Sequence, residues 1–232
     1  MSCGLNLKII AKIKSDFPTK FGIPRQSGLA PSLKAKIVFE KEFFSPEALR
    51  GLENFSHIWL IWEFSESKRE NWSPTVRPPR LGGNRKTGVF ATRSPFRPNP
   101  LGLSLVKVEK IENGEIFVSG ADLMDGTPVY DIKPYLPETE SIPFAANRFA
   151  EKTVKKLLEV EFAPEIIDKI PENKAVELKE ILALDPRPAY QNDPERIYGF
   201  IFAGSEVKFK VAENILTVIG IRQQKQGFSD RK

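Results

Sequence analysis

The chain has 232 residues, 41% of them hydrophobic and 28% charged, which is ordinary for a soluble globular protein and leaves room for a main domain with a smaller companion. Its formal net charge of +5 is compatible with a polyanionic partner. A single cysteine excludes an internal disulfide, and together with a single histidine it argues against a structural zinc site.

The first part of the chain, up to Pro137, predicts strands and almost no helix. Short apolar runs bounded by turn residues indicate the strands, and Asn113-Gly114 supplies a two-residue hairpin turn. Ser45–Leu52 predicts a short helix with Pro46 at its first position. The expected strands are Leu7–Ile13, Ala35–Phe39, His57–Phe64, Gly88–Thr92, the hairpin Leu103–Gly120 and Pro128–Tyr135. Without a strand–helix–strand rhythm, we expect an antiparallel or mixed sheet closed into a barrel.

The pattern changes near Ser141. Asn147–Phe162 has apolar residues near helical spacing, and Ala175–Leu184 indicates a second helix. Tyr198–Arg222 predicts a three-stranded meander with turns at Gly204-Ser205 and Glu213-Asn214. We therefore expect a smaller α+β domain after the β-rich part.

A rigid cationic segment, Ala91–Gly102 (ATRSPFRPNPLG), lies between two of the expected strands. Its three prolines remove backbone donors and fix φ, so it is neither a central strand nor a helix interior. The segment has two interpretations: a stiff crossover whose arginines cap carbonyl groups, or one wall of a ligand pocket. Arg93, Arg97 and Asn99, held on a pre-ordered path, favour the pocket.

Other loops carry further candidate residues, each with an alternative structural role. Lys20–Leu29 holds a cation and an amide on a turn-rich loop, and Arg77–Lys86 is a basic loop suited to phosphate contacts or to simple solvation. In Asp122–Pro137 a turn carboxylate precedes a strand, and we expect Asp131 to pair with an arginine of the 93–97 segment. Asp185–Tyr190 (DPRPAY) adds a proline-locked arginine and an aromatic ring.

Six motifs in this order resemble the TrmO (TsaA-like) family of tRNA methyltransferases. They are PRQSGL, GLENFSHIWLIWEF, PTVRPPRLGGN, TGVFATRSPFRPNPLGLS, DGTPVYDIKPYLP and DPRPAY. The resemblance implies a mainly β fold, with a single-sheeted β-barrel over residues 1–143 that binds S-adenosylmethionine and a small α+β domain over residues 144–232 for tRNA or dimer contacts. It also implies a homodimer that methylates N6 of N6-threonylcarbamoyladenosine at position 37 of tRNA.

The family's motifs assign cofactor contacts to positions of this chain. They are Pro24, Arg25, Gln26, Ser65, Glu66, Arg93, Leu103, Asp125, Gly126, Thr127 and Pro128. Ser65 and Glu66 stand where another member has His-Gln, which puts a side-chain role there in question. This departure is the one feature that favours the alternative function, a non-catalytic RNA- or nucleotide-binding barrel. A small-molecule methyltransferase is a third hypothesis.

Methyl transfer from a sulfonium requires alignment of nucleophile, methyl carbon and sulfur, and the weakly acidic N6 proton must be removed. The candidate proton acceptors are Asp131, Asp185 and Tyr190. The candidate substrate contacts are Arg77, Arg80, Arg97, Asn99 and Arg187, of which Arg97 or Arg187 would hold the threonyl carboxylate. The reaction needs no metal.

The sequence also gives expectations about location. It has no apolar run long enough to span a membrane, and lysines interrupt its short apolar N-terminal segment. We expect a reduced, cytoplasmic protein with no membrane association.

Overall fold

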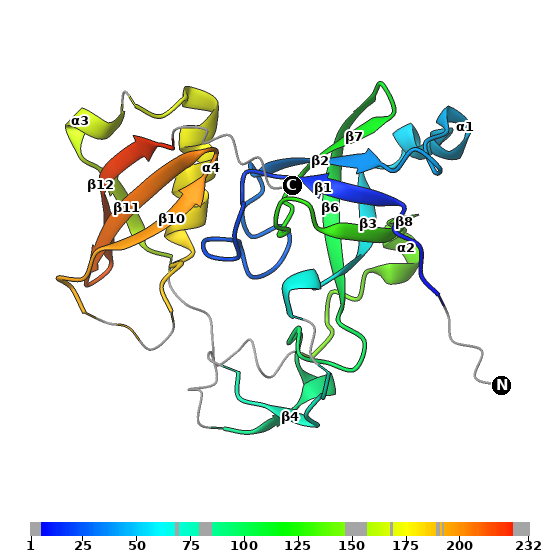
Figure 1. Ribbon diagram of the computed structural model, residues 1–232, viewed down its shortest axis with the longest axis horizontal. Helices are drawn as coiled ribbons and strands as arrows, with labels where there is room; N and C mark the ends of the chain where they lie inside the picture. Colours follow the sequence, from blue (N-terminus) through cyan, green and yellow to red (C-terminus); the bar gives the residue numbers. More distant parts are fainter. Residues whose placement is uncertain are drawn as a thin grey trace, which may run out of the picture.

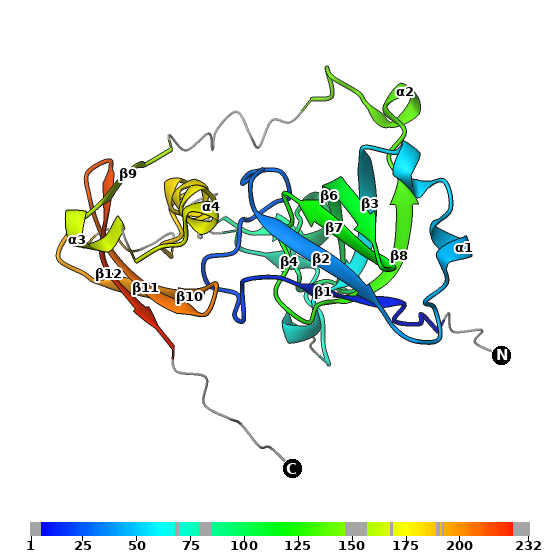
Figure 2. The same ribbon diagram turned by 90° about the horizontal axis from the view of Figure 1, so that it is seen from above.

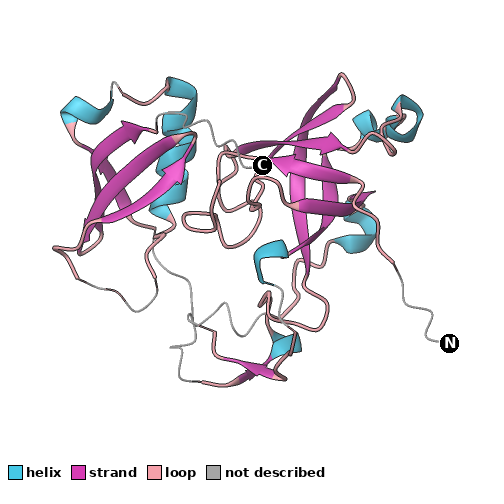
Figure 3. Cartoon of the chain, in the orientation of Figure 1, coloured by secondary structure: helices cyan, strands magenta, loops and turns pink. Residues whose placement is uncertain are grey.

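The chain folds into a closed β-barrel and a separate four-stranded sheet, which lie side by side, and a small two-stranded hairpin lies below them in the view of Figure 1. The computed structural model describes residues 6–67, 70–78, 85–146, 157–167, 169–188, 191 and 193–224. Strands dominate and the helices are few and mostly short, as the cartoon coloured by secondary structure shows (Figure 3). The prediction of a mainly β fold with a barrel is confirmed.

The barrel has six strands, each antiparallel to both neighbours. In spatial order they are β1 (Ala11–Lys14), β2 (Lys34–Phe39), β7 (Glu115–Ser119), β6 (Leu101–Glu112), β3 (His57–Glu63) and β8 (Pro128–Pro134). Alternate residues point inward, so Ile13, Ile37, Ile58, Leu60 and Ile116 form a fully buried core. Closure removes the sheet edges, as expected for an isolated antiparallel sheet.

The hairpin between β6 and β7 turns where the sequence indicates. Asn113 and Gly114 both have positive φ, at 51° and 75°, as a two-residue turn matched to the strand twist requires. The expected hairpin is confirmed, although β6 begins at Leu101, two residues earlier than predicted.

Two sequence predictions in this domain are wrong in detail. The predicted strand Gly88–Thr92 is mostly a 3-10 turn, η4 (Val89–Ala91), because Thr92 closes the turn by donating backbone and side-chain hydrogen bonds to the Val89 carbonyl. β1 begins at Ala11, and the apolar residues before it are largely outside the ladder. The remaining short elements are α1 (Pro46–Leu49), η1 (Leu52–Asn54), η2 (Ser65–Ser67), β4 (Thr75–Val76), β5 (Thr87–Gly88) and α2 (Pro137–Glu140).

The second sheet contains the predicted meander and one unexpected strand. Its order is β10 (Tyr198–Phe202), β11 (Ser205–Ala212), β12 (Ile215–Gln223) and β9 (Glu159–Phe162). The helix α4 (Glu172–Ala183) confirms the predicted second helix, and α3 (Pro164–Ile167) is a single turn. The helix predicted over Asn147–Phe162 is wrong at its end, because Glu159–Phe162 alternates with period two and pairs parallel to β12. Residues 147–156 lie outside the described residues.

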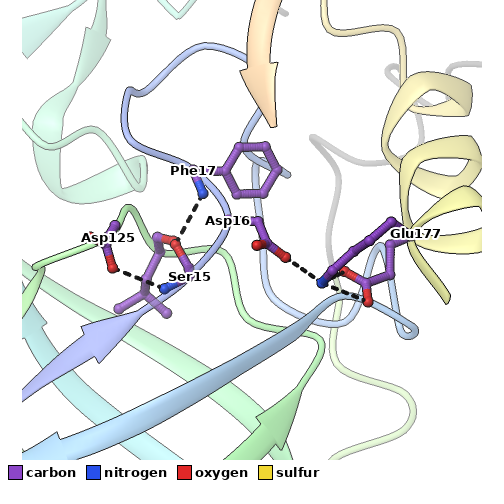
Figure 4. A network of polar contacts seen from close by, with 7 residues as sticks. Ser15, Asp16, Phe17, Asp125 and Glu177 are labelled. Carbon is purple, nitrogen blue, oxygen red and sulfur yellow. Dashed lines mark hydrogen bonds and ion pairs between the residues drawn. The ribbon is translucent and has the colours of Figure 1, made fainter. Parts of the chain in front are cut away.

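The loop after β1 joins the two parts of the molecule. Phe17, Ala30 and Leu33 belong to the core of the second sheet, where the Phe17 and Phe202 rings lie 5.3 Å apart. Asp16 forms an ion pair with Lys174, which also contacts the buried Glu177 at 3.1 Å (Figure 4). The view from above shows this loop between the barrel and α4 (Figure 2). The loop therefore holds the second sheet against the barrel.

Candidate functional site

Two adjoining hollows open beside the ends of β3 and β6. The inner pocket, of about 580 Å³, lies between the Lys20–Leu29 loop, the end of β3, the 92–103 segment and the Asp122–Thr127 turn. The outer cleft, of about 1450 Å³, extends from there between the β4–β5 hairpin and Arg187, which follows α4. Arg25, Glu63, Arg93 and Arg97 line both hollows, so a molecule in one can meet a molecule in the other.

A chain of hydrogen bonds forms one wall of the inner pocket. The Trp62 indole Nε1 donates to Ser104 Oγ at 2.9 Å, and Ser104 Oγ donates to Asp122 Oδ1 at 2.5 Å. Gly102 makes room for the indole, because a Cβ at this position would lie 2.2 Å from the ring. The strand β6 thus places Gly102 and Ser104 so that the Trp62 ring fits against Gly102 and Ser104 orients Asp122.

Asp122 is a mostly buried carboxyl group in this wall. Burial raises its pKa, while the hydrogen bond from Ser104 and the positive charge of Arg93 oppose that rise. A carboxylate in such a place suits a bound cation or a pair of hydroxyl groups, which would compensate for its lost hydration.

Arg93 is held by the loop that faces it. Its Nη1 donates a hydrogen bond to Gln26 Oε1, and Gln26 Nε2 donates to the Arg25 carbonyl at 2.6 Å. The Lys20–Leu29 loop is itself tied to the barrel, because Leu105 N donates to Ser27 Oγ at 3.1 Å. The guanidinium therefore stands pre-ordered in the pocket, which reduces the entropy lost on binding an anion.

Arg97 has both of the roles that the sequence suggests for its segment. Its Nη1 donates to the carbonyl oxygens of Thr92 at 3.0 Å and Ser94 at 3.4 Å, so it stiffens a backbone poor in its own donors. It also lines both hollows.

Arg187 reaches the outer cleft because a buried carboxylate holds it. Asp185, which is 5% exposed and has a positive φ of 55°, contacts Arg187 Nε at 2.8 Å and Nη2 at 3.2 Å. This paired geometry is typical of arginine–carboxylate recognition and fixes the plane of the guanidinium.

Glu63, at the end of β3, accepts a hydrogen bond from the Tyr130 hydroxyl at 2.8 Å. Burial, with the hydrogen bond and charge of Glu63, raises the pKa of Tyr130 to about 12. Tyr130 therefore stays protonated and acts as a hydrogen-bond donor that orients Glu63.

The structure brings many of the sequence-derived candidates together. The inner pocket is lined by Pro24, Arg25, Gln26, Ser65, Glu66, Arg93, Arg97, Asn99, Leu103 and Thr127. Arg77 and Arg187 line the outer cleft. Arg80 and Tyr190 lie outside the described residues.

Five described candidates are not among the lining residues of either hollow: Asp125, Gly126, Pro128, Asp131 and Asp185. Asp125 anchors the loop after β1, since Ser15 N donates to its Oδ1 at 3.1 Å (Figure 4), and Gly126 and Pro128 flank Thr127 at the same turn. Asp131 is 46% exposed and pairs with Lys133 at 3.0 Å, so the expected pairing with the 93–97 segment is wrong.

Sequence reasoning missed Trp62, Glu63, Trp72 and Asp122, which all line the hollows. Asp122 directly precedes the turn motif, and Glu63 closes the strongest apolar strand, so both had a positional signal. Within the described ranges no cluster of three metal-ligating side chains occurs. In the same part of the chain, none of the helices has the length and apolar character needed to cross a membrane.

The comparisons with known proteins cover nearly the whole chain. Residues 12–141 match the family model of the tRNA-methyltransferase O N-terminal domain, and residues 155–224 match that of the TrmO C-terminal domain. A tRNA (adenine(37)-N6)-methyltransferase of Escherichia coli is 40% identical over 88% of this chain and 92% of its own length. A Pseudomonas aeruginosa protein with the provisional name S-adenosylmethionine-dependent methyltransferase is 43% identical over 82% of this chain and 85% of its own. The crystal structure of TrmO from Pseudomonas aeruginosa has a TM-score of 0.79 at 32% identity and covers 97% of this chain and 99% of that one.

Proposed function

This chain belongs to the TrmO family, and on that premise we propose that it is an enzyme that methylates N6 of adenine 37 in tRNA, with S-adenosylmethionine as donor. Both of its domains match the family, and the relatives carry names for this reaction and this donor. We further propose that the substrate is N6-threonylcarbamoyladenosine, that the enzyme is a cytoplasmic homodimer, and that the domain boundary lies near residue 143.

The observation that carries this proposal is the junction of the two hollows at Glu63, Arg93 and Arg97. A donor held in the inner pocket would lie beside a base that enters through the outer cleft. Methyl transfer is an in-line displacement, so its rate depends chiefly on holding the two reactants in this alignment.

The inner pocket has residues that fit S-adenosylmethionine. Its volume of about 580 Å³ is typical of small-molecule sites, and Ile23, Trp62 and Leu103 supply apolar surface. When bound, S-adenosylmethionine supplies an activated methyl group on a sulfonium cation. Arg93 is the group that would bind its carboxylate, and Asp122 would bind its ammonium or ribose hydroxyl groups.

Two of the three candidate proton acceptors have charged partners of their own, which supports the third. Asp131 pairs with Lys133 away from the hollows, and Asp185 is engaged in holding Arg187. We therefore retain Tyr190, three residues beyond Arg187, as the candidate that takes the N6 proton. Tyr190→Phe should lower kcat and leave the affinity for S-adenosylmethionine unchanged. A variant with the wild-type kcat would remove Tyr190 from this role.

The experiment that tests the function uses tRNA from cells that lack this gene. The purified protein is incubated with this tRNA and labelled S-adenosylmethionine, and the digested nucleosides are analysed by mass spectrometry. A gain of one CH₂ on threonylcarbamoyladenosine would establish substrate and reaction. Label on another nucleoside would refute the substrate assignment. Cofactor binding without transfer would instead support the non-catalytic module that the Ser65-Glu66 departure favours.

A further inference from the structure

A pair of exposed aromatic rings stands at the outer cleft. Trp72, which lines the cleft, is 50% exposed, and Phe90 beside it is 71% exposed, with ring centroids 6.1 Å apart and planes tilted by 35°. From the proposed function and this geometry, we propose that Trp72 stacks on a tRNA base that neighbours the target adenine. The proposal rests on the assignment of tRNA as the substrate.

The aromatic pair is held in place by the small hairpin. Thr75 pairs with Gly88 and Val76 with Thr87, and Val89 N donates to the Pro74 carbonyl at 3.0 Å. Val89, directly before Phe90, is buried and so anchors this part of the chain. Trp72 and Phe90 are therefore presented by ordered backbone, which lowers the entropy cost of stacking.

The charge of the cleft identifies the class of ligand. Among its described lining residues only Glu63 and Glu70 are acidic, against a larger basic set. The basic residues are Arg25, Arg77, Lys86, Arg93, Arg97 and Arg187. A basic groove with an exposed aromatic ring is the arrangement by which proteins bind unpaired nucleic-acid bases, because the rings stack while the cations meet the phosphates.

The position of Trp72 separates it from the target adenine. An adenine that accepts the methyl group must reach the inner pocket, and Trp72 lines only the outer cleft. The base that Trp72 holds is therefore another one, adjacent in the loop. Stacking on it would hold the strand open while the adenine enters the inner pocket.

The test compares Trp72→Leu, Trp72→Ala and Trp72→Phe with the wild-type protein. An anticodon stem-loop RNA containing the target adenine serves as the binding probe, and tRNA as the substrate. If Trp72 stacks, the Leu and Ala variants should bind RNA about tenfold to a hundredfold more weakly and raise KM for tRNA, and Phe should restore most of the loss. The affinity for S-adenosylmethionine should not change. Trp59→Leu, in a residue that contacts Glu140 outside both hollows, is the matched control.

A spectroscopic readout distinguishes stacking from a structural role. RNA should quench indole fluorescence in the wild-type protein, and a large part of this quench should be missing in Trp72→Phe at saturating RNA. Equal RNA affinity for the Leu and Phe variants, or an unchanged quench, would overturn the proposal. A change of oligomeric state in Trp72→Leu would also overturn it and assign the residue to contacts between copies. If the wild-type protein binds the RNA but does not methylate tRNA from cells that lack this gene, the proposed function fails and the binding data still decide the role of Trp72.

Discussion

Arg93 is the residue whose role the pocket defines most directly. Its guanidinium is tied to Gln26 and lies where the inner pocket and outer cleft meet. We proposed that this guanidinium makes a charge-assisted contact to the donor's carboxylate, since its hydrogen bond to Gln26 holds it ready in the pocket.

Arg93→Ala is expected to weaken S-adenosylmethionine binding by about tenfold to a hundredfold, the range of a lost charged hydrogen bond. Isothermal titration calorimetry measures this affinity. Arg50→Ala is the control, since Arg50 forms an exposed ion pair with Glu47 far from the pocket. Equal affinity in the Arg93 variant and the control would refute the assignment.

Asp122→Asn is expected to change stability and binding in opposite directions. Because burial raises the pKa of Asp122, the folded state holds this proton more tightly than the unfolded state does, and the wild-type protein loses stability as the pH rises through that pKa. The variant does not titrate, so its melting temperature should exceed the wild-type value near about pH 8 and approach it near about pH 4. Its affinity for S-adenosylmethionine should fall by about tenfold.

The two measurements for Asp122 have separate failure outcomes. Thermal unfolding across the pH range follows the titration of Asp122, and calorimetry measures the affinity for S-adenosylmethionine. A melting-temperature difference that does not vary with pH would contradict the stability argument, and an unchanged affinity would remove Asp122 from the donor site.

At the scale of elements, β6 shapes the inner pocket because Gly102 has no side chain. The Trp62 ring occupies the space of a side chain there, and Ser104, two residues on, faces the same side and accepts the indole hydrogen bond. The strand alternation therefore sets both the packing of Trp62 and the orientation of Asp122.

Gly102→Ala should force Trp62 to move, because the new Cβ would lie 2.2 to 2.6 Å from three ring carbons. We expect a loss of about 1–3 kcal/mol in the free energy of unfolding, as for other overpacked sites, and weaker donor binding. Gly88→Ala is a matched control in another strand, with no atom within 4 Å of its Cβ position. Denaturant unfolding measures the free energy of unfolding of both variants. A similar small loss of stability in the two would contradict the packing argument.

At the scale of the whole molecule, the loop after β1 makes the two domains one structure. Phe17 lies in the core of the second sheet although it is far from that sheet in sequence. Glu180 also accepts two hydrogen bonds from Ser32, at 2.9 and 2.8 Å. The outer cleft, with Arg187 on one side and the hairpin on the other, depends on this contact.

Phe17→Ala should lower the free energy of unfolding by about 3–5 kcal/mol, since it leaves a cavity between the domains. Thermal unfolding of the variant should also separate into two transitions, because the contact that couples the domains is weakened. Phe144→Ala, at a side chain that is 99% exposed, should change stability by less than about 0.5 kcal/mol. A single transition at the wild-type temperature in Phe17→Ala would contradict the coupling.

Local patterns predict the elements well where one rule acts alone. The hairpin at Asn113-Gly114 follows from the positive φ that these two residues tolerate, and α4 follows from its apolar spacing. The strand predicted over Gly88–Thr92 is wrong because the Thr92 side chain closes a turn there. The helix predicted to extend to Phe162 is wrong over Glu159–Phe162. The short apolar pattern there is compatible with a helix or a strand, and pairing with β12 decides for the strand.

By itself the sequence determined the mainly β class, the motifs of the family and some of the residues that line the inner pocket. These depend on local spacing and residue type, which a single chain displays directly. Only the tertiary structure decided that Asp131 faces Lys133, that Asp185 holds Arg187, and that Trp72 and Asp122 line the site. Asp131 and Lys133, like Asp185 and Arg187, are only two residues apart, and the local backbone conformation decides whether such side chains meet. Trp72 and Asp122 come from distant parts of the chain, and only the packing of the folded chain brings them to the site.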